Sequence, residues 1–76
     1  MQSLTVNLNS IEKVRKFVTV LYGIESDFDL ASDRYVIDAK SIMGIFSLDL
    51  SKDLRLDIYN DDMVEKATEL LAPFIV

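Results

Sequence analysis

Alternation of apolar and polar residues recurs in four segments of the chain, at residues 3–8, 27–31, 34–38 and 54–58. Because successive side chains of a strand point to opposite faces, this spacing gives each segment one apolar and one polar face. We therefore predict four half-buried strands, with Arg55 and Asp57 pointing outward from the last one. Ser32-Asp33 separates the two middle segments and predicts a hairpin with a tight turn.

Apolar residues spaced three or four positions apart predict a long first helix. Its apolar side begins with Ile11 and continues to Leu21. Asn9 and Glu12 have the spacing of a capping box, in which the carboxylate returns to the amide of the cap residue. We expect this helix to end at Gly23, which would adopt the left-handed conformation.

Two further helices follow from the same spacing. The second is short and runs from Ser41, at or near its N-cap, to about Leu48. The third is capped by Asn60 and ends at Pro73, because proline cannot continue a helix. Residues 74–76 should then trail off.

The order βαββαβα predicts an α+β protein. We expect residues 1–76 to form a single domain, an open-faced sandwich of one four-stranded, mainly antiparallel sheet with three helices on one face. The uncovered face should be wet and rich in Asp, since antiparallel sheets tolerate solvent on one side.

The composition excludes several kinds of function. The chain has no Cys and no His, and its net charge is −5. Disulfides and thiolate metal sites are therefore excluded, and the commonest general base and metal ligand is missing. The negative charge would repel a phosphate backbone, so we expect no nucleic-acid partner. We also expect no enzyme activity, no metal and no cofactor.

The sequence also bears on the cellular location and the oligomeric state of the protein. No apolar run reaches the length of about 18 residues that a membrane span needs. The N-terminus lacks the pattern of a signal peptide. We therefore expect a cytoplasmic protein without a membrane partner, either a monomer or a weak homodimer.

Two charged clusters have a simple interpretation beside a functional one. Acidic residues gather on the predicted outer face of the sheet, at Asp27, Asp29 and Asp57. Paired carboxylates can bind a hard cation, but a solvated face that opposes edge aggregation explains them more simply. A basic cluster lies in the first helix, at Lys13, Arg15 and Lys16. It is either a vestige of anion binding or, more simply, a charged outer helix face.

Residues 40–44 read Lys-Ser-Ile-Met-Gly and are followed by Ser47-Leu48. This stretch resembles the second-helix signature of HPr, the small histidine-containing phosphocarrier family of the bacterial sugar phosphotransferase system. The element order and the length are also similar to those of HPr, and the motif match is specific over about residues 36–48. The resemblance implies the HPr-like sandwich and a role related to sugar phosphotransfer.

The chain departs from HPr where that family carries its phosphoryl group. In HPr, a His at the start of the first helix bears the phosphate and an Arg two residues later helps to hold it. The corresponding stretch here contains no His, so the resemblance makes Ser10 and Lys13 a vestigial phosphate site, with the negative Glu12 beside it. A phosphate ester on Ser10 would be too stable to pass on readily. We therefore predict a chain incapable of histidine phosphotransfer.

The resemblance also implies that Ser41 is a regulatory phosphoserine site. In HPr of Gram-positive bacteria, the Ser of this motif is modified by an ATP-dependent Ser kinase and read by a transcriptional regulator of carbon catabolite repression. The chain is similar to the catabolite-repression HPr-like protein, which lacks the carrier His and keeps this Ser. A phosphate on a capping Ser meets free backbone amides. The alternative interpretation is a plain N-cap, which contributes about 1 kcal/mol.

The apolar run after Ser41 is larger than a short helix can bury. We expect Ile45 and Leu48 to point inward and an exposed patch to dock protein partners. The residues predicted to bind partners are Lys40, Ile42, Met43 and Phe46. If Phe46 turned inward, no such patch would exist.

The sequence thus favours a non-catalytic, HPr-like regulatory or adaptor domain. Two alternatives stay open. The first is a phosphotransfer component that uses another acceptor, such as Ser10. The second is a small homo-oligomeric structural module that uses the same apolar patch.

Overall fold

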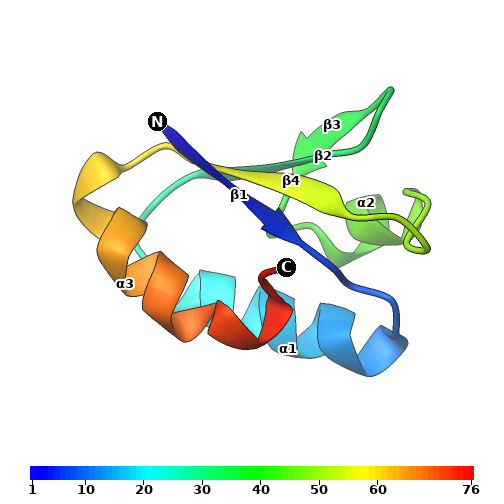
Figure 1. Ribbon diagram of the computed structural model, residues 1–76, viewed down its shortest axis with the longest axis horizontal. Coiled ribbons are helices and arrows are strands. Elements are labelled where there is room, and N and C mark those ends of the chain that lie inside the picture. The colour runs from blue at the N-terminus through cyan, green and yellow to red at the C-terminus, as the bar shows by residue number, and fades with distance from the viewer.

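The computed structural model describes residues 1–76 and has strands and helices in the predicted order (Figure 1). The strands are β1 (Gln2–Val6), β2 (Phe28–Ala31), β3 (Val36–Asp38) and β4 (Leu54–Ile58). The α-helices are α1 (Ile11–Tyr22), α2 (Ile42–Phe46) and α3 (Val64–Leu70). Two 3-10 turns flank α3, namely η1 (Asp61–Met63) and η2 (Ala72–Phe74). None of the helices is both long and apolar enough to cross a lipid bilayer.

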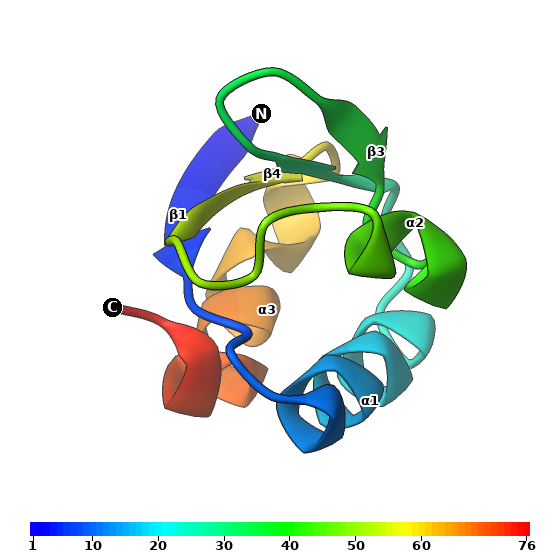
Figure 2. The same cartoon turned by 90° about the vertical axis from the view of Figure 1, so that its right-hand side faces the viewer.

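The strands form one sheet in the order β1-β4-β2-β3, with every neighbouring pair antiparallel. Figures 1 and 2 show α1 and α3 side by side under one face of this sheet, with α2 next to β3 and the opposite face uncovered. The predicted α+β open-faced sandwich is therefore confirmed, and the sheet is antiparallel throughout.

Eighteen buried apolar residues form a single cluster between the sheet and the helices. The central strand β4 contributes Leu54, Leu56 and Ile58, as the alternation predicted. Phe17 of α1 and Phe28 of β2 are among the largest fully buried side chains. Burial of such a side chain stabilises the fold by about 1.5–3 kcal/mol, so this layer is the main source of stability.

The C-terminal residues are held in place, and the prediction that they trail off is wrong. Phe74 is buried and its ring meets that of Phe17 edge to face, with 5.6 Å between the centroids. The Asn7 amide donates a hydrogen bond to the Phe74 carbonyl oxygen (2.8 Å), and the Val76 amide donates to the Thr5 carbonyl oxygen (3.0 Å). The turn η2 thus carries the chain back to β1 and closes one end of the core.

Ser10 caps α1, so the prediction of an Asn9 cap is wrong. Ser10 has extended backbone (φ −147°), and its hydroxyl accepts a hydrogen bond from the Lys13 amide (3.1 Å). This shift by one residue places Glu12 at the second helical position, too early for a capping box. Glu12 instead forms a salt bridge with Lys16 one turn later (3.1 Å).

The end of α1 also differs from prediction, because no residue has a positive φ. Gly23 has φ −85°, so the predicted left-handed stop is wrong, and the chain continues right-handed until Ile24 enters the core. The predicted hairpin between β2 and β3 is present. Its loop spans residues 32–35 and is closed by the Ser32 amide donating to the Tyr35 carbonyl oxygen (2.9 Å).

Asp57 lies on the uncovered face of the sheet but does not face solvent, contrary to prediction. The residue is only 6% exposed. The Ser3 hydroxyl donates a hydrogen bond to its Oδ1 (2.7 Å), while Arg55 donates from Nε to Oδ1 (3.0 Å) and from Nη2 to Oδ2 (3.3 Å). A carboxylate tolerates burial when it is paired and hydrogen-bonded, and these three contacts meet that requirement.

Like charges face each other across neighbouring strands on this side of the sheet. Asp29 of β2 lies opposite Asp57 of β4 and opposite Asp38 of β3. The Tyr59 hydroxyl donates a hydrogen bond to the Asp29 carboxylate. That bond raises the pKa of Tyr59 above its ordinary value. Partial desolvation and the negative charges of Asp29, Asp57 and Asp27 raise this pKa further, with smaller effects. No group of three or more His, Cys, Asp or Glu side chains is arranged to hold a metal ion.

The position of the C-terminal turn predicts a large stability difference between two Phe variants. Phe74→Ala should lower the free energy of unfolding by about 3–5 kcal/mol, because it leaves a cavity beside Phe17. Phe46→Ala truncates a side chain that is 41% exposed and should cost about 1 kcal/mol or less. Urea unfolding followed by circular dichroism measures both. Equal losses would contradict the assignment of Phe74 to the core.

The hydrogen bond on the uncovered face predicts that Asp29→Asn lowers the pKa of Tyr59. The amide carries no charge and is a weaker acceptor. A raised pKa favours the neutral phenol in the folded protein, so its stabilising contribution is present below about pH 10 and is lost as the pH rises through the folded-state pKa. NMR titration of the Tyr59 ring, with Tyr59→Phe to assign the signal, measures the shift. An unchanged pKa in Asp29→Asn would rule out Asp29 as the cause.

Candidate functional site

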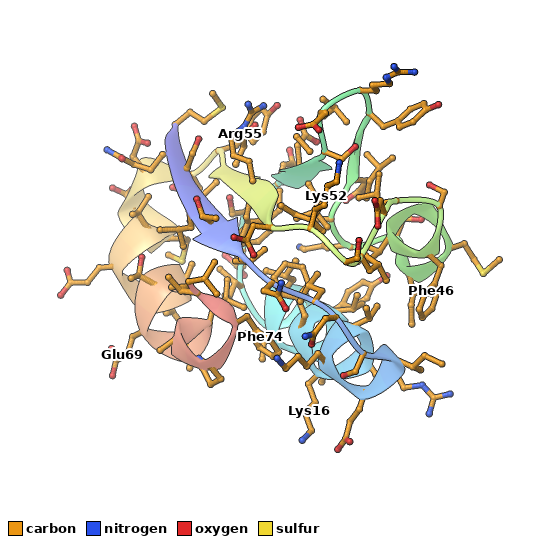
Figure 3. All side chains as sticks on the ribbon, turned by 45° about the vertical axis from the view of Figure 1, so that its right-hand side comes forward. Lys16, Phe46, Lys52, Arg55, Glu69 and Phe74 are labelled. Carbon is orange, nitrogen blue, oxygen red and sulfur yellow. The ribbon has the colours of Figure 1, made fainter.

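The start of α1 and the helix α2 meet around a shallow hollow on the helix side of the molecule. Its lining residues are Asn9, Ser10, Ile11, Phe46, Leu50 and Ser51. Figure 3 shows the Phe46 side chain extending from α2 toward the beginning of α1. The structure therefore brings together two segments that the sequence analysis had singled out separately, the Ser10 region and the Lys-Ser-Ile-Met-Gly stretch.

Ser41 is the N-cap of α2, as predicted. Its backbone is extended (φ −92°), its side chain is exposed, and its hydroxyl accepts a hydrogen bond from the Gly44 amide (3.2 Å). Gly44 fits closely at this point, since a Cβ atom there would lie 3.2 Å from the Ser41 Oγ and 3.5 Å from the Ile37 side chain. The absent side chain lets α2 approach β3 while Ser41 stays at the surface.

Lys40 precedes this cap, and its ammonium group has partners within the fold. Nζ donates a hydrogen bond to the Ile24 carbonyl oxygen (3.3 Å) and lies 5.6 Å and 6.0 Å from the ring centroids of Phe28 and Tyr22. The Tyr22 hydroxyl donates in return to the Lys40 carbonyl oxygen (3.1 Å). Lys40 thus joins the start of α2 to the end of α1, and its contact with a partner stays a prediction.

The apolar residues of α2 divide much as the sequence predicted. Ile45 and the following Leu48 are buried, whereas Met43 is 77% exposed and Phe46 is 41% exposed. Ile42 differs from the prediction of a fully exposed patch, because it is half-buried and packs against the core. The exposed part of the predicted patch is therefore narrower and consists of Met43 and Phe46.

Ile11 of α1 extends this exposed area, and sequence reasoning missed it. The residue is 63% exposed and lines the same hollow as Phe46. Its helical spacing suggested a core position, but it is the first residue of α1, one turn before the helix reaches the core at Val14. We call Ile11, Met43 and Phe46 together the α2 surface.

The loop after α2 completes the rim of the hollow. The Asp49 carboxylate accepts hydrogen bonds from the Ser51 hydroxyl (2.6 Å) and the Ser51 amide (3.1 Å). These two bonds, the hydroxyl first, hold the pKa of Asp49 below its ordinary value. The ionised carboxylate thus fixes the turn that presents Leu50 and Ser51 to the hollow.

Ser10 and Lys13 do not share a pocket. The Ser10 hydroxyl contacts the Lys13 backbone amide, but Lys13 lines a different groove on the other side of α1, whereas Ser10 lines the hollow beside α2. Glu12, which lies between them in the sequence, is exposed and forms a salt bridge with Lys16. The hydrogen bond at the Ser10 hydroxyl comes from a backbone amide and not from a cationic side chain, and the vestigial phosphate site stays a prediction.

Comparison with solved structures identifies proteins with the same architecture. The crystal structure of HPr-C-His from Thermoanaerobacter tengcongensis matches with a TM-score of 0.79 and 28% sequence identity over 96% of this chain and 89% of that chain. The phosphocarrier protein HPr from Bacillus anthracis strain Ames matches with a TM-score of 0.73 and 26% identity over 99% of this chain and 94% of that chain. No protein-family model and no curated protein sequence matches. The chain therefore has the fold of the HPr phosphocarrier proteins.

Proposed function

We propose that this chain is a regulatory or adaptor domain related to the sugar phosphotransferase system. In this proposal it does not transfer phosphate through histidine, and it docks partner proteins through the α2 surface. The HPr-like fold supports a role related to that system. The observation that carries the docking proposal is the exposure of Ile11 and Phe46 around one hollow, with Met43 exposed on the same helix as Phe46.

The side chains of the α2 surface suit protein recognition. Exposed apolar side chains that cluster on a small domain mark contact sites more often than those scattered singly. The flexible thioether of Met43 adapts to differently shaped partners, and the Phe46 ring supplies a large apolar contact. Because Ile45 and Leu48 anchor α2 in the core, its exposed side is presented on a rigid support.

The proposal excludes histidine phosphotransfer on chemical grounds. The chain contains no His, so no phosphorus–nitrogen bond to imidazole can form. The hydroxyl nearest the start of α1 belongs to Ser10, and it serves as the helix cap. A phosphate ester at Ser10 would hold its group more firmly than a carrier requires.

In the same proposal, phosphorylation of Ser41 regulates docking. Its hydroxyl is exposed at the start of α2, two residues before Met43. A phosphate adds about −1.5 to −2 charge at neutral pH and three strong acceptor oxygens. Because the phosphate would lie beside the apolar α2 surface, its charge would weaken the binding of an apolar partner and strengthen the binding of a partner with arginine side chains.

Labelling with two phosphate donors tests the chemistry. Phosphoenolpyruvate with the general phosphotransferase enzyme should leave the chain unlabelled, since no imidazole is present. ATP with an HPr Ser kinase should give an acid-stable label that Ser41→Ala abolishes, while Ser47→Ala keeps it. Transfer from phosphoenolpyruvate that Ser10→Ala removes would overturn the proposal in favour of a phosphotransfer component.

Substitution on the α2 surface tests docking. Phe46→Asp should reduce capture of partner proteins from a lysate of the source organism at least about tenfold, because it places a charge in an apolar contact. Tyr35→Asp is the matched control, since Tyr35 is 61% exposed but lies on the hairpin loop. Light scattering measures the mass of the wild-type chain and of both variants, and so distinguishes an adaptor from a homo-oligomeric structural module. The adaptor role would be contradicted if the wild-type chain formed an oligomer that Phe46→Asp dissociates. It would also be contradicted if both variants reduced the capture of partner proteins equally.

A further inference from the structure

A second groove on the helix side lies between α1 and the C-terminal turn η2. The apolar residues that line it are Val20, Leu70, Pro73 and Phe74. The cationic residues Lys13, Arg15 and Lys16 of α1 also line it, together with Thr19, and no carboxylate does. Figure 3 shows the Lys16 side chain extending from α1 away from Phe46.

The charge of this groove is opposite to that of the molecule as a whole. The net charge is −5, and the two hollows beside the hairpin loop both contain Asp33 and Asp53. Lys13 forms no salt bridge, and Lys16 has only the exposed bridge to Glu12, which solvent weakens. The groove is thus the one hollow of the four whose charged lining residues are all cations.

The apolar lining gives the groove a second kind of specificity. Leu70 is 46% exposed at the end of α3. Val20 is half-buried beside it, and the ring of Phe74 closes the bottom. A ligand that fills this groove must therefore offer an apolar group to Leu70 and negative charges to the lysines.

We propose that this groove docks an acidic segment of a protein partner, with carboxylates at Lys13 and Lys16 and an aliphatic side chain on Leu70. Charge complementarity carries the proposal, because Lys13 forms no salt bridge, the bridge of Lys16 to Glu12 is exposed to solvent, and no carboxylate lines the groove. The site is separate from the α2 surface, since the two hollows share no lining residue. Failure of either proposal leaves the other unaffected.

Titration with short synthetic peptides tests this docking. The probe is the capped peptide Glu-Glu-Leu-Leu-Glu-Glu, added at millimolar concentration to the isotope-labelled full chain. Amide signals of Lys13, Lys16, Leu70 and Phe74 should shift, and the shifts should weaken as salt screens the charges. The peptides Lys-Lys-Leu-Leu-Lys-Lys and Glu-Glu-Ser-Ser-Glu-Glu should produce no comparable shifts. Absence of shifts with the probe, or equal shifts with the basic peptide, would overturn the proposal.

Two variants and one control locate the binding. Lys13→Glu and Leu70→Gln should each weaken binding of the probe about fivefold, because one reverses a charge that lines the groove and the other removes an apolar contact. Lys66→Glu reverses an exposed charge of α3 outside the groove and should leave the affinity unchanged. Equal weakening by Lys66→Glu would contradict the location. If the mass of the wild-type chain in solution rises with concentration and that of Lys13→Glu does not, a second copy of the chain occupies the groove. That result would also overturn the proposal.

Discussion

Burial of one apolar layer between the sheet and the helices is the constraint on which the rest of the structure depends. A chain of this length can build only one such layer, so β1, β2 and β4 turn their inward residues to the side on which α1 and α3 lie. The remaining helix, α2, has five residues, of which only Ile45 is buried. Met43 and Phe46 therefore have no interior to enter. The apolar surface available for recognition is a consequence of how the layer is filled.

The uncovered face obeys a different rule because no second layer covers it. Its charged groups have to satisfy one another across the strands. Asp57 becomes buried only because Arg55 and Ser3 surround its oxygens, and Asp29 opposite it is hydrogen-bonded by Tyr59. This face is organised by hydrogen bonds within the sheet, and its cation is already bound to a carboxylate. Lys13 and Lys16, which line the groove proposed to bind an acidic segment, lie on the helix side instead.

Local periodicity predicted the parts of the fold that depend on local spacing. The alternation that places Leu54, Leu56 and Ile58 inward needs only the geometry of a strand, and the Ser41 cap needs only the residues of its own turn. The choice between Asn9 and Ser10 as the cap of α1 could not be made this way. Both are good caps, and the path of the chain after β1 decides which backbone is extended.

Contacts between distant segments explain the other failures. Phe74 is buried because it reaches Phe17, fifty-seven positions earlier, and Lys40 is engaged because the Ile24 carbonyl lies sixteen positions before it. No pattern within one segment contains that information. The HPr-like motif predicted where α2 lies, and the exposure of Ile11 beside it required the packing of α1 against α2.

The geometry of α1 shows how the two proposed docking areas fit on so small a chain. Val14, Phe17 and Leu21 form the buried side of the helix. Lys13 and Val20 are seven residues apart, about two turns, and so occupy one flank of that side, whereas Ile11 lies on the other flank. The core side thus separates an apolar flank from a basic one. A protein bound to one flank need not cover the other, and under the two docking proposals the difference in charge would select a different partner for each.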